Sequence, residues 1–308
     1  MKMGKFRLRG HKRRNHQKVP REERIPLRSI VPNLVTSLAA CAGITSICFS
    51  SEGRFKEALW ALLVACLCDG VDGRIARLLK ASSKLGAELD SLADFVNFGV
   101  APAIFMFHWL TGKFIGGTPI STPVIRLVLS GALFYALCDC FRLARFNTML
   151  EQPTLPFWKP FFTGVPAPGG CWMVLTPAII YECAITDKSD SFAIFLRHPA
   201  FGIFMLLFIG LLMASRLPTI SLKSIHIKRR FQLPVMAGAL LIIAFLVANF
   251  WLTLGVVGFI YMFTIPLTGV IFLKLRAKYE RENPNFKQTF FQKQTNFQNK
   301  ETTNETHD

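Results

Sequence analysis

The sequence predicts an all-α membrane protein, a polytopic helical bundle with about eight transmembrane helices. Hydrophobic residues make up 51% of the 308-residue chain, and the mean hydropathy is +0.37. Charged residues make up 18%, below the roughly 25% of a soluble globular protein. The apolar residues also fall into blocks long enough to cross a bilayer. These observations exclude a soluble enzyme and a disordered chain, and favour helices, whose backbone hydrogen bonds are satisfied within each span.

The expected spans follow one another with short connections. They cover residues 31–50, 56–80, 86–111, 124–146, 165–184, 199–215, 233–249 and 252–274. Several are short or contain proline, such as Pro177 and Pro266, so a total of six or seven stays open. The chain therefore divides into a basic cytoplasmic arm (1–28), a membrane domain (29–275) and a polar cytoplasmic tail (276–308).

Positive charge is concentrated at one end of the chain and on alternate connections. The arm holds eleven Lys and Arg against two Glu, which is more than half of the net charge of +17. Because it directly precedes an apolar span, we expect it to bind anionic membrane lipids rather than nucleic acid. We expect an integral protein of the bacterial inner (cytoplasmic) membrane. The bias in Lys and Arg predicts that both termini and the loop at residues 80–84 face the cytoplasm.

Four aspartates lie inside or beside the second and third spans. Asp69 and Asp72 lie three residues apart, and Asp90 and Asp94 lie four apart. Each pair shares one face of its helix. A turn near residues 81–83 would fold the two helices antiparallel and bring the acidic faces together. Acids within spans are costly and indicate function.

Four clustered carboxylates repel one another, and divalent cations would remove that conflict. All-oxygen ligation suits two Mg²⁺ or Mn²⁺ ions, which commonly bridge carboxylates and phosphates. Gly73, Ala76 and Gly86 are small enough for a ligand or another helix to approach. In the alternative reading these small residues are packing contacts and the acids pair with Arg74 and Arg77, but paired helices do not need four acids.

The spacing of these residues resembles the sequence signature of a known enzyme family. The pattern Asp69-x2-Asp72-Gly73-x2-Ala76-Arg77-x8-Gly86-x3-Asp90-x3-Asp94 matches every position of the signature of the CDP-alcohol phosphatidyltransferases. The resemblance implies a membrane enzyme with two divalent metal ions. Such an enzyme joins an alcohol to the phosphatidyl group of a CDP-activated lipid and releases CMP.

The resemblance also implies a role for each residue of the signature. Asp69, Asp72, Asp90 and Asp94 would lie at the metal site, and Asp94 would also act as the general base. Gly73, Ala76 and Gly86 would shape the cytidine pocket, and Arg77 would contact phosphate. Members of the family are commonly homodimeric.

Four further stretches resemble the integral-membrane phosphatidylserine synthase branch. They are IVPNL (30–34), RLARFN (142–147), FTGVPAP (162–168) and SRLPTISLK (215–223). CDP-diacylglycerol and L-serine are then the expected substrates. Arg142 or Arg145 could bind the serine carboxylate, or both could be cytoplasmic anchors. Asp139 either pairs with Arg142 or meets the serine ammonium, and Asn33 either contacts the diphosphate or caps its helix.

Other functions remain open at this point. The acceptor could be choline, glycerol 3-phosphate or inositol, although choline would need an aromatic cage and glycerol 3-phosphate more cationic groups. A divalent-cation transporter is the alternative from another class. It predicts acids spread through the depth of the bilayer, whereas these acids cluster near one face.

Overall fold

The computed structural model describes residues 30–81, 83–112, 120–149, 161–185, 190–215, 218–220 and 232–282. The basic arm and the tail after residue 282 lie outside the described residues. The first half of the chain forms α1 (Ile30–Ser51), α2 (Phe55–Leu78), α3 (Lys84–Asp94), the π-helix η2 (Phe95–Val100), α4 (Ala101–Thr111) and α5 (Thr122–Met149). Helices α3, η2 and α4 follow one another without a break and form one continuous helical segment, the α3–α4 rod.

The second half continues the helical pattern. Its elements are β1 (Phe161–Thr163), α6 (Ala167–Ile179), the π-helix η3 (Ile180–Ala184), α7 (Ser191–Arg197), α8 (Pro199–Ala214), β2 (Pro218–Ile220), α9 (Gln232–Ala248) and α10 (Phe250–Glu282). Each expected span therefore coincides with a helix or with a short run of helices.

Fewer helices than expected meet the length and composition of a membrane span. Four do so within the described residues: Ile30–Ser51, Lys84–Thr111, Thr122–Thr148 and Phe250–Lys274. The bent pair α7–α8 raises the number to five if it is a single span. The predicted total of about eight is not confirmed, because α2 carries the acids and arginines of the signature, α6 has 13 residues and α9 has 17.

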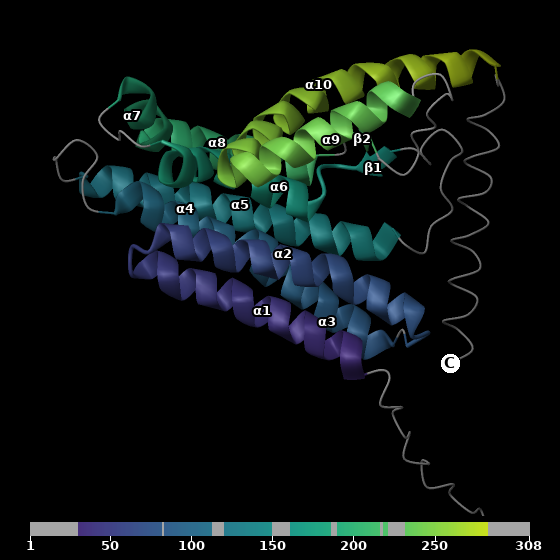
Figure 1. Ribbon diagram of the computed structural model, residues 1–308, viewed down its shortest axis with the longest axis horizontal. Coiled ribbons are helices and arrows are strands. Elements are labelled where there is room, and N and C mark those ends of the chain that lie inside the picture. The colour runs from purple at the N-terminus through teal and green to yellow at the C-terminus, as the bar shows by residue number, and fades with distance from the viewer. Residues whose placement is uncertain are drawn as a thin grey trace, which may run out of the picture.

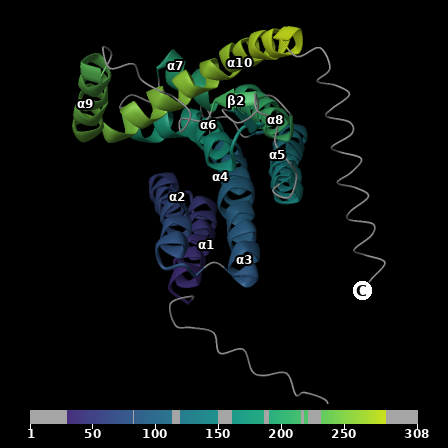
Figure 2. The same cartoon turned by 90° about the vertical axis from the view of Figure 1, so that its right-hand side faces the viewer.

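The helices pack into a bundle around an aromatic and aliphatic core. Helix α1 packs along α2, and α5 packs along α8. Figure 1 shows α1, α2 and the α3–α4 rod on one side and α10 across the opposite side, while Figure 2 shows α9 standing apart. The largest fully buried side chains include Trp109, Tyr135, Phe98 and Phe105. No residue of α9 is buried within the described structure.

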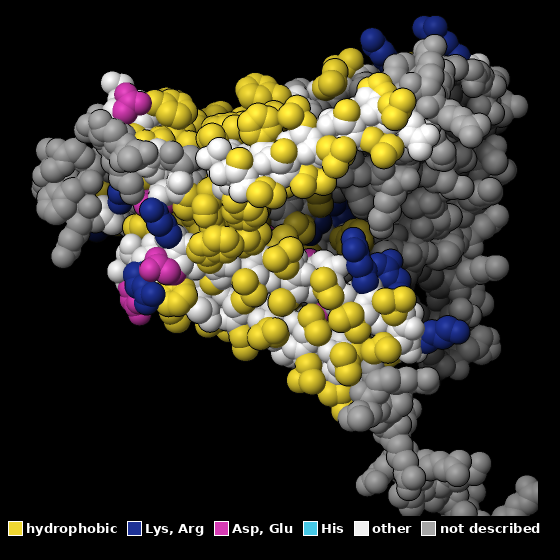
Figure 3. All heavy atoms as spheres, viewed as in Figure 1, with side chains coloured by type: hydrophobic (Ala, Val, Ile, Leu, Met, Phe, Trp, Pro, Cys, Tyr) yellow, Lys and Arg dark blue, Asp and Glu magenta, His cyan; other side chains and the backbone are white. Residues whose placement is uncertain are grey.

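The outer surface is apolar along most of the bundle. Figure 3 shows hydrophobic side chains covering the visible face, with charged groups gathered toward its ends. The exposed apolar residues include Leu34 and Leu67 on the first two helices and Leu240 and Val247 on α9. A surface of this kind is suited to lipid rather than to water.

One small strand pair departs from the all-helical prediction. β1 and β2 are antiparallel, with Phe161 opposite Ile220 and Thr163 opposite Pro218. They belong to two of the stretches noted in the sequence, which are thus neighbours in space. Gly164 follows β1 at a φ of +82°, and a methyl group there would lie 2.9 Å from the carbonyl oxygens of both Met213 and Ser215. Only glycine meets both requirements.

The last helix is longer than expected. The sequence places the start of the polar tail at residue 276, yet α10 continues to Glu282. No glycine or proline interrupts the chain between Lys274 and Glu282, and Pro284 is the next helix breaker. Helix α10 therefore extends past the change from apolar to polar residues at residue 275, and the division of the chain into arm, membrane domain and tail stays a prediction.

Candidate active site

The site lies where α2 ends and α3 begins, beside the first turns of α1. Ser83 caps α3, and its hydroxyl accepts a hydrogen bond from the Gly86 amide at 3.0 Å. Helix α1 packs against both α2 and α3. The acidic faces of α2 and α3 therefore converge beside α1, as the spacing of the aspartates predicts.

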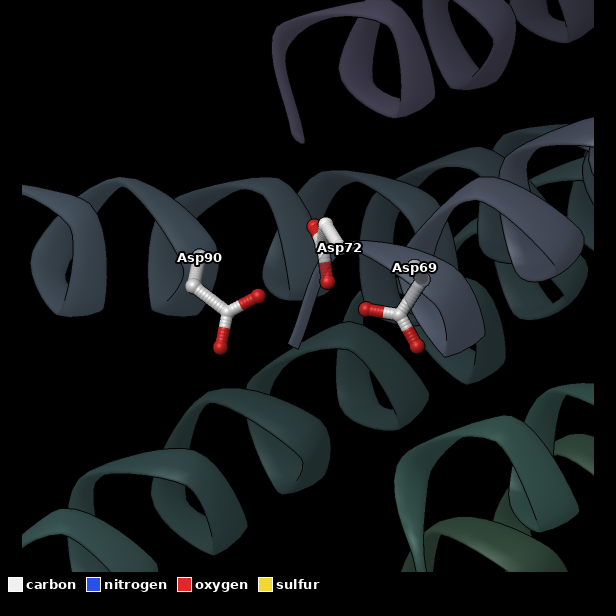
Figure 4. Close-up of side chains that lie close together, drawn as sticks. All are labelled: Asp69, Asp72 and Asp90. Atoms are coloured by element: carbon white, nitrogen blue, oxygen red, sulfur yellow. The ribbon is translucent and has the colours of Figure 1, made fainter. Parts of the chain in front are cut away.

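Three of the four aspartates form a tight cluster. One carboxylate oxygen from each of Asp69, Asp72 and Asp90 lies within 4.8 Å of the other two. Figure 4 shows these three side chains close together, two from α2 and one from α3. Asp72 is buried, and its Oδ2 accepts a hydrogen bond from Thr36 Oγ1 at 2.6 Å. This bond from α1 fixes the orientation of the central carboxylate.

Asp94 lies one turn beyond Asp90, at the edge of the cluster. Its carboxyl interacts with that of Asp69. Its Oδ1 is buried and has no hydrogen-bond partner among the residues that the structure describes. A buried oxygen without a partner is costly, so this atom is expected to meet a ligand.

The donor set fits divalent cations. Among the described residues, no ion pair joins these acids to Arg74 or Arg77. The Arg77 Nε instead donates to the Gly73 carbonyl oxygen at 3.1 Å. The alternative in which these arginines neutralise the acids is therefore not found in this part of the chain. Closely spaced carboxylate oxygens are the ligands that hard divalent ions prefer, so the cluster can bind a metal.

A cavity of about 180 Å³ opens beside the cluster. Helices α1, α2 and α3 and the turn before α3 contribute its walls. The lining residues are Pro32, Asn33, Thr36, Asp72, Gly73, Ala76, Arg77, Ala81, Ser83, Gly86, Ala87 and Asp90. All five residues predicted to bind the CDP-lipid (Asn33, Gly73, Ala76, Arg77 and Gly86) are therefore brought together here.

The two glycines of the signature face different surroundings. A methyl group at Gly73 would meet nothing within 4 Å, so this position borders open space that a ligand can enter. A methyl group at Gly86 would lie 2.9 Å from Asn33 Oδ1. Gly86 thus permits the close approach of α1 and α3, which is a packing role, and at the same time lines the cavity.

Thr36 is a site residue that the sequence analysis missed. It is buried, lines the cavity and donates to Asp72. Its position three residues after Asn33, and so on the same face of the helix, is a signal that could have indicated it.

Arg142 and Arg145, near the end of α5, have different partners. Arg142 Nε forms an ion pair with Asp139 Oδ1 at 3.3 Å, which confirms the expected pairing. The Arg145 guanidinium donates instead to the carbonyl oxygens of Ala214 at 2.7 Å and Ser215 at 3.0 Å, at the end of α8. A role for either in binding serine stays a prediction.

Comparison with known proteins places this site in a family. The sequence model described as CDP-alcohol phosphatidyltransferase matches residues 29–200, and a second, CDP-alcohol phosphatidyltransferase 2, matches residues 230–266. The first match covers more than half of the chain and includes the whole cavity. The protein therefore belongs to the CDP-alcohol phosphatidyltransferase family, whose members generally use a divalent metal.

Several curated relatives share a more specific name within this family. A CDP-diacylglycerol–serine O-phosphatidyltransferase of Mycobacterium leprae is 43% identical over 157 residues, which are 51% of this chain and 49% of that protein. Proteins of the same name from Helicobacter pylori (30% identical over 61% of this chain and 70% of the relative) and Bacillus subtilis (33% over 47% and 75%) are also similar. The chain spans about half the length of the mycobacterial relatives that it matches.

Proposed function

We propose that this protein transfers the phosphatidyl group of CDP-diacylglycerol to the hydroxyl of L-serine, giving phosphatidylserine and CMP. The observation that carries the proposal is the cavity in which the acidic cluster, Arg77 and the open space at Gly73 meet. The curated relatives are named as CDP-diacylglycerol–serine O-phosphatidyltransferases, which supports serine as the acceptor.

The acidic cluster is the proposed site of two divalent ions, Mg²⁺ or Mn²⁺. Asp69, Asp72, Asp90 and Asp94 would hold them. Such ions offset the charge of the diphosphate and stabilise CMP as a leaving group. The Thr36 hydroxyl keeps Asp72 in place, and Arg77 is positioned at the cavity wall to meet a phosphate oxygen. Gly73, Ala76 and Gly86 leave room for the cytidine, and Asn33 can donate to the diphosphate.

Asp94 is the proposed general base. In the reaction the serine hydroxyl oxygen forms a bond to the lipid-bearing phosphorus, and the bond from that phosphorus to the CMP oxygen breaks. CMP leaves with the electron pair, and Asp94 takes the hydroxyl proton. The buried Oδ1 of Asp94, which has no partner among the described residues, supports this assignment.

Arg142 is the better candidate to bind the serine carboxylate. The Arg145 guanidinium already donates to carbonyl oxygens at the end of α8. Arg142 has a single ion pair in the described structure, with Asp139, and Asp139 lies against Gly99 of the π-helix that directly follows Asp94. A cation near the proposed base would hold the serine so that its hydroxyl faces the base.

The proposal includes a setting for the reaction. The protein would be an integral protein of the bacterial inner membrane, with the cavity facing the cytoplasm and the acyl chains in the surrounding lipid. The exposed Arg74, Arg77 and Lys80 near the end of α2 support this orientation. A homodimer is also proposed, on the family resemblance alone.

The acceptor can be tested with purified protein in detergent micelles that contain CDP-diacylglycerol and Mg²⁺ or Mn²⁺. Serine, serine amide, choline, glycerol 3-phosphate and inositol are supplied in turn, and CMP release is measured. We expect turnover with serine and poor turnover with its amide, because the amide lacks the carboxylate that Arg142 would bind. Equal rates with both would contradict carboxylate recognition, and turnover with choline, glycerol 3-phosphate or inositol but not serine would contradict the acceptor.

A further inference from the structure

Helix α5 contacts the π-helix η2 through one face. Tyr135, Asp139 and Arg142 lie at intervals of four and three residues and therefore share that face. The Tyr135 hydroxyl donates to the carbonyl oxygen of Phe98 at 2.9 Å. One turn later, Asp139 lies against Gly99, where an added methyl group would be 2.8 Å from Asp139 Oδ2. Both contacts hold the segment that directly follows Asp94.

Asp139 is an unusual residue to find at this contact. Its side chain is fully buried, and its only ion pair in the described structure is the one between Oδ1 and Arg142 Nε. Oδ2 has no hydrogen-bond partner among the described residues. A buried carboxylate with one oxygen unsatisfied is a poor source of stability, because its desolvation cost can exceed the attraction of the pair. An apolar side chain would pack α5 on η2 at lower cost.

The ion pair fixes the direction of the Arg142 side chain. Arg142 is 11% exposed, so its guanidinium lies at the edge of the interior rather than in solvent. The bond to Asp139 uses Nε and leaves the two terminal nitrogens to meet a ligand. Bidentate binding of a carboxylate by arginine depends on such a fixed orientation.

We infer that Asp139 is a positioning residue that aims Arg142 at the acceptor's carboxylate and links it to the helix carrying Asp94. The inference rests on the proposed function, because it assumes an acceptor that bears a carboxylate. Gly99 contributes to this positioning, because only a residue without a side chain leaves room for Asp139 Oδ2 at this point of η2. The distance between the acceptor's hydroxyl and its carboxylate would then be matched by the placement of Asp94 and Arg142.

The test separates the KM for serine from kcat and from the KM for CDP-diacylglycerol. We expect Asp139→Ala to raise the KM for serine by about 10-fold, in line with the loss of other groups that orient a ligand-binding side chain. The kcat and the KM for CDP-diacylglycerol should change much less. Asp139→Asn keeps an oxygen that can accept from Arg142 Nε, so it should recover part of the loss.

Tyr135→Phe is the matched control. Tyr135 is equally buried on the same face of α5, and the substitution removes its bond to η2 but leaves the ion pair of Arg142 intact. It should lower thermal stability without a specific rise in the KM for serine. If Tyr135→Phe gives the same rise as Asp139→Ala, or if Asp139→Ala affects both substrates alike, Asp139 is merely structural and the inference is overturned.

A double-mutant cycle supplies an independent readout. In the Arg142→Ala background, Asp139→Ala should cause no further rise in the KM for serine, because the two residues act through one side chain. Additive effects would overturn the inference. Should Asp139→Ala fail to fold, Gly99→Ala replaces it, since the added methyl group must displace Asp139 Oδ2. We then expect the same serine-specific rise, and an unchanged KM would count against the inference.

The proposed function is tested by the acceptor assay on the wild-type protein alone, without any variant. No turnover with serine would reject serine as the acceptor. Because choline, glycerol 3-phosphate and inositol carry no carboxylate, turnover with one of them in place of serine would overturn the inference as well. Turnover of the wild type with serine, without a serine-specific rise in KM for Asp139→Ala, would overturn the inference alone.

Discussion

At the scale of single residues, the four aspartates of the signature are not equivalent. Asp69, Asp72 and Asp90 form one close group, whereas Asp94 stands at its edge with a buried oxygen that no described residue satisfies. Asp72 is further fixed by Thr36. This difference is the reason for proposing that the first three chiefly bind metal and that the fourth, at the edge of the metal site, takes the proton.

Substitution of each acid by asparagine tests this division. Asp69→Asn, Asp72→Asn and Asp90→Asn should lose divalent-cation affinity and activity together, because a neutral amide is a poorer ligand for a hard cation. Asp94→Asn should instead lower kcat by about 10²–10⁴-fold while CDP-diacylglycerol still binds. Metal titration of activity and a lipid-binding assay distinguish the two. A variant of Asp94 that loses lipid binding as severely as kcat would contradict its role as base.

At the scale of helices, the site depends on how closely α1 approaches α3. Gly86 allows that approach, and Gly73 faces the space left open. The two glycines form a natural pair for comparison, because both lie in helices, where alanine is intrinsically favoured over glycine by about 1 kcal/mol.

Gly86→Ala and Gly73→Ala should therefore behave differently. At position 86 the new methyl group would press on Asn33, so we expect lower thermal stability together with lower activity. At position 73 nothing in the protein obstructs the methyl group, so stability should be kept or slightly raised while the KM for CDP-diacylglycerol rises. Thermal unfolding and steady-state kinetics of both variants provide the check. A destabilised Gly73→Ala protein with a normal KM would remove this residue from the ligand-binding wall.

Local patterns predict part of this architecture and not the rest. The spacing of Asp69, Asp72, Asp90 and Asp94 is enough to place the acids on two helix faces, because helical periodicity is a local property. The bond from Thr36 to Asp72 depends on how α1 packs beside α2, which no local pattern determines. The pairing of β1 with β2 joins segments more than fifty residues apart in sequence and is equally invisible to such patterns.

At the scale of the whole molecule, the number of crossings and the side of the active site are linked. Four or five helices of the described structure are long and apolar enough to span a bilayer, while the charge pattern favours both termini in the cytoplasm. A shared side for the two ends requires an even number of crossings. The number of spans and the location of the site can therefore be tested together.

Labelling of single cysteines in intact cells makes that test. The eight native cysteines are first replaced, and one is then introduced near each terminus and at position 82. All three should react only with a membrane-permeant reagent, because Lys and Arg are retained on the cytoplasmic side. A C-terminal cysteine that reacts with an impermeant reagent would mean an odd number of crossings. Such a reaction at position 82 would place the cavity on the opposite face.

The central claim is that the cavity between α1, α2 and α3 joins serine to the phosphatidyl group. The most direct measurement supplies labelled serine in the acceptor assay and quantifies labelled lipid and CMP together. We predict phosphatidylserine and CMP in equal amounts when Mg²⁺ or Mn²⁺ is present, and neither product after chelation with EDTA. Release of CMP without labelled lipid, or full turnover in EDTA, would contradict the account.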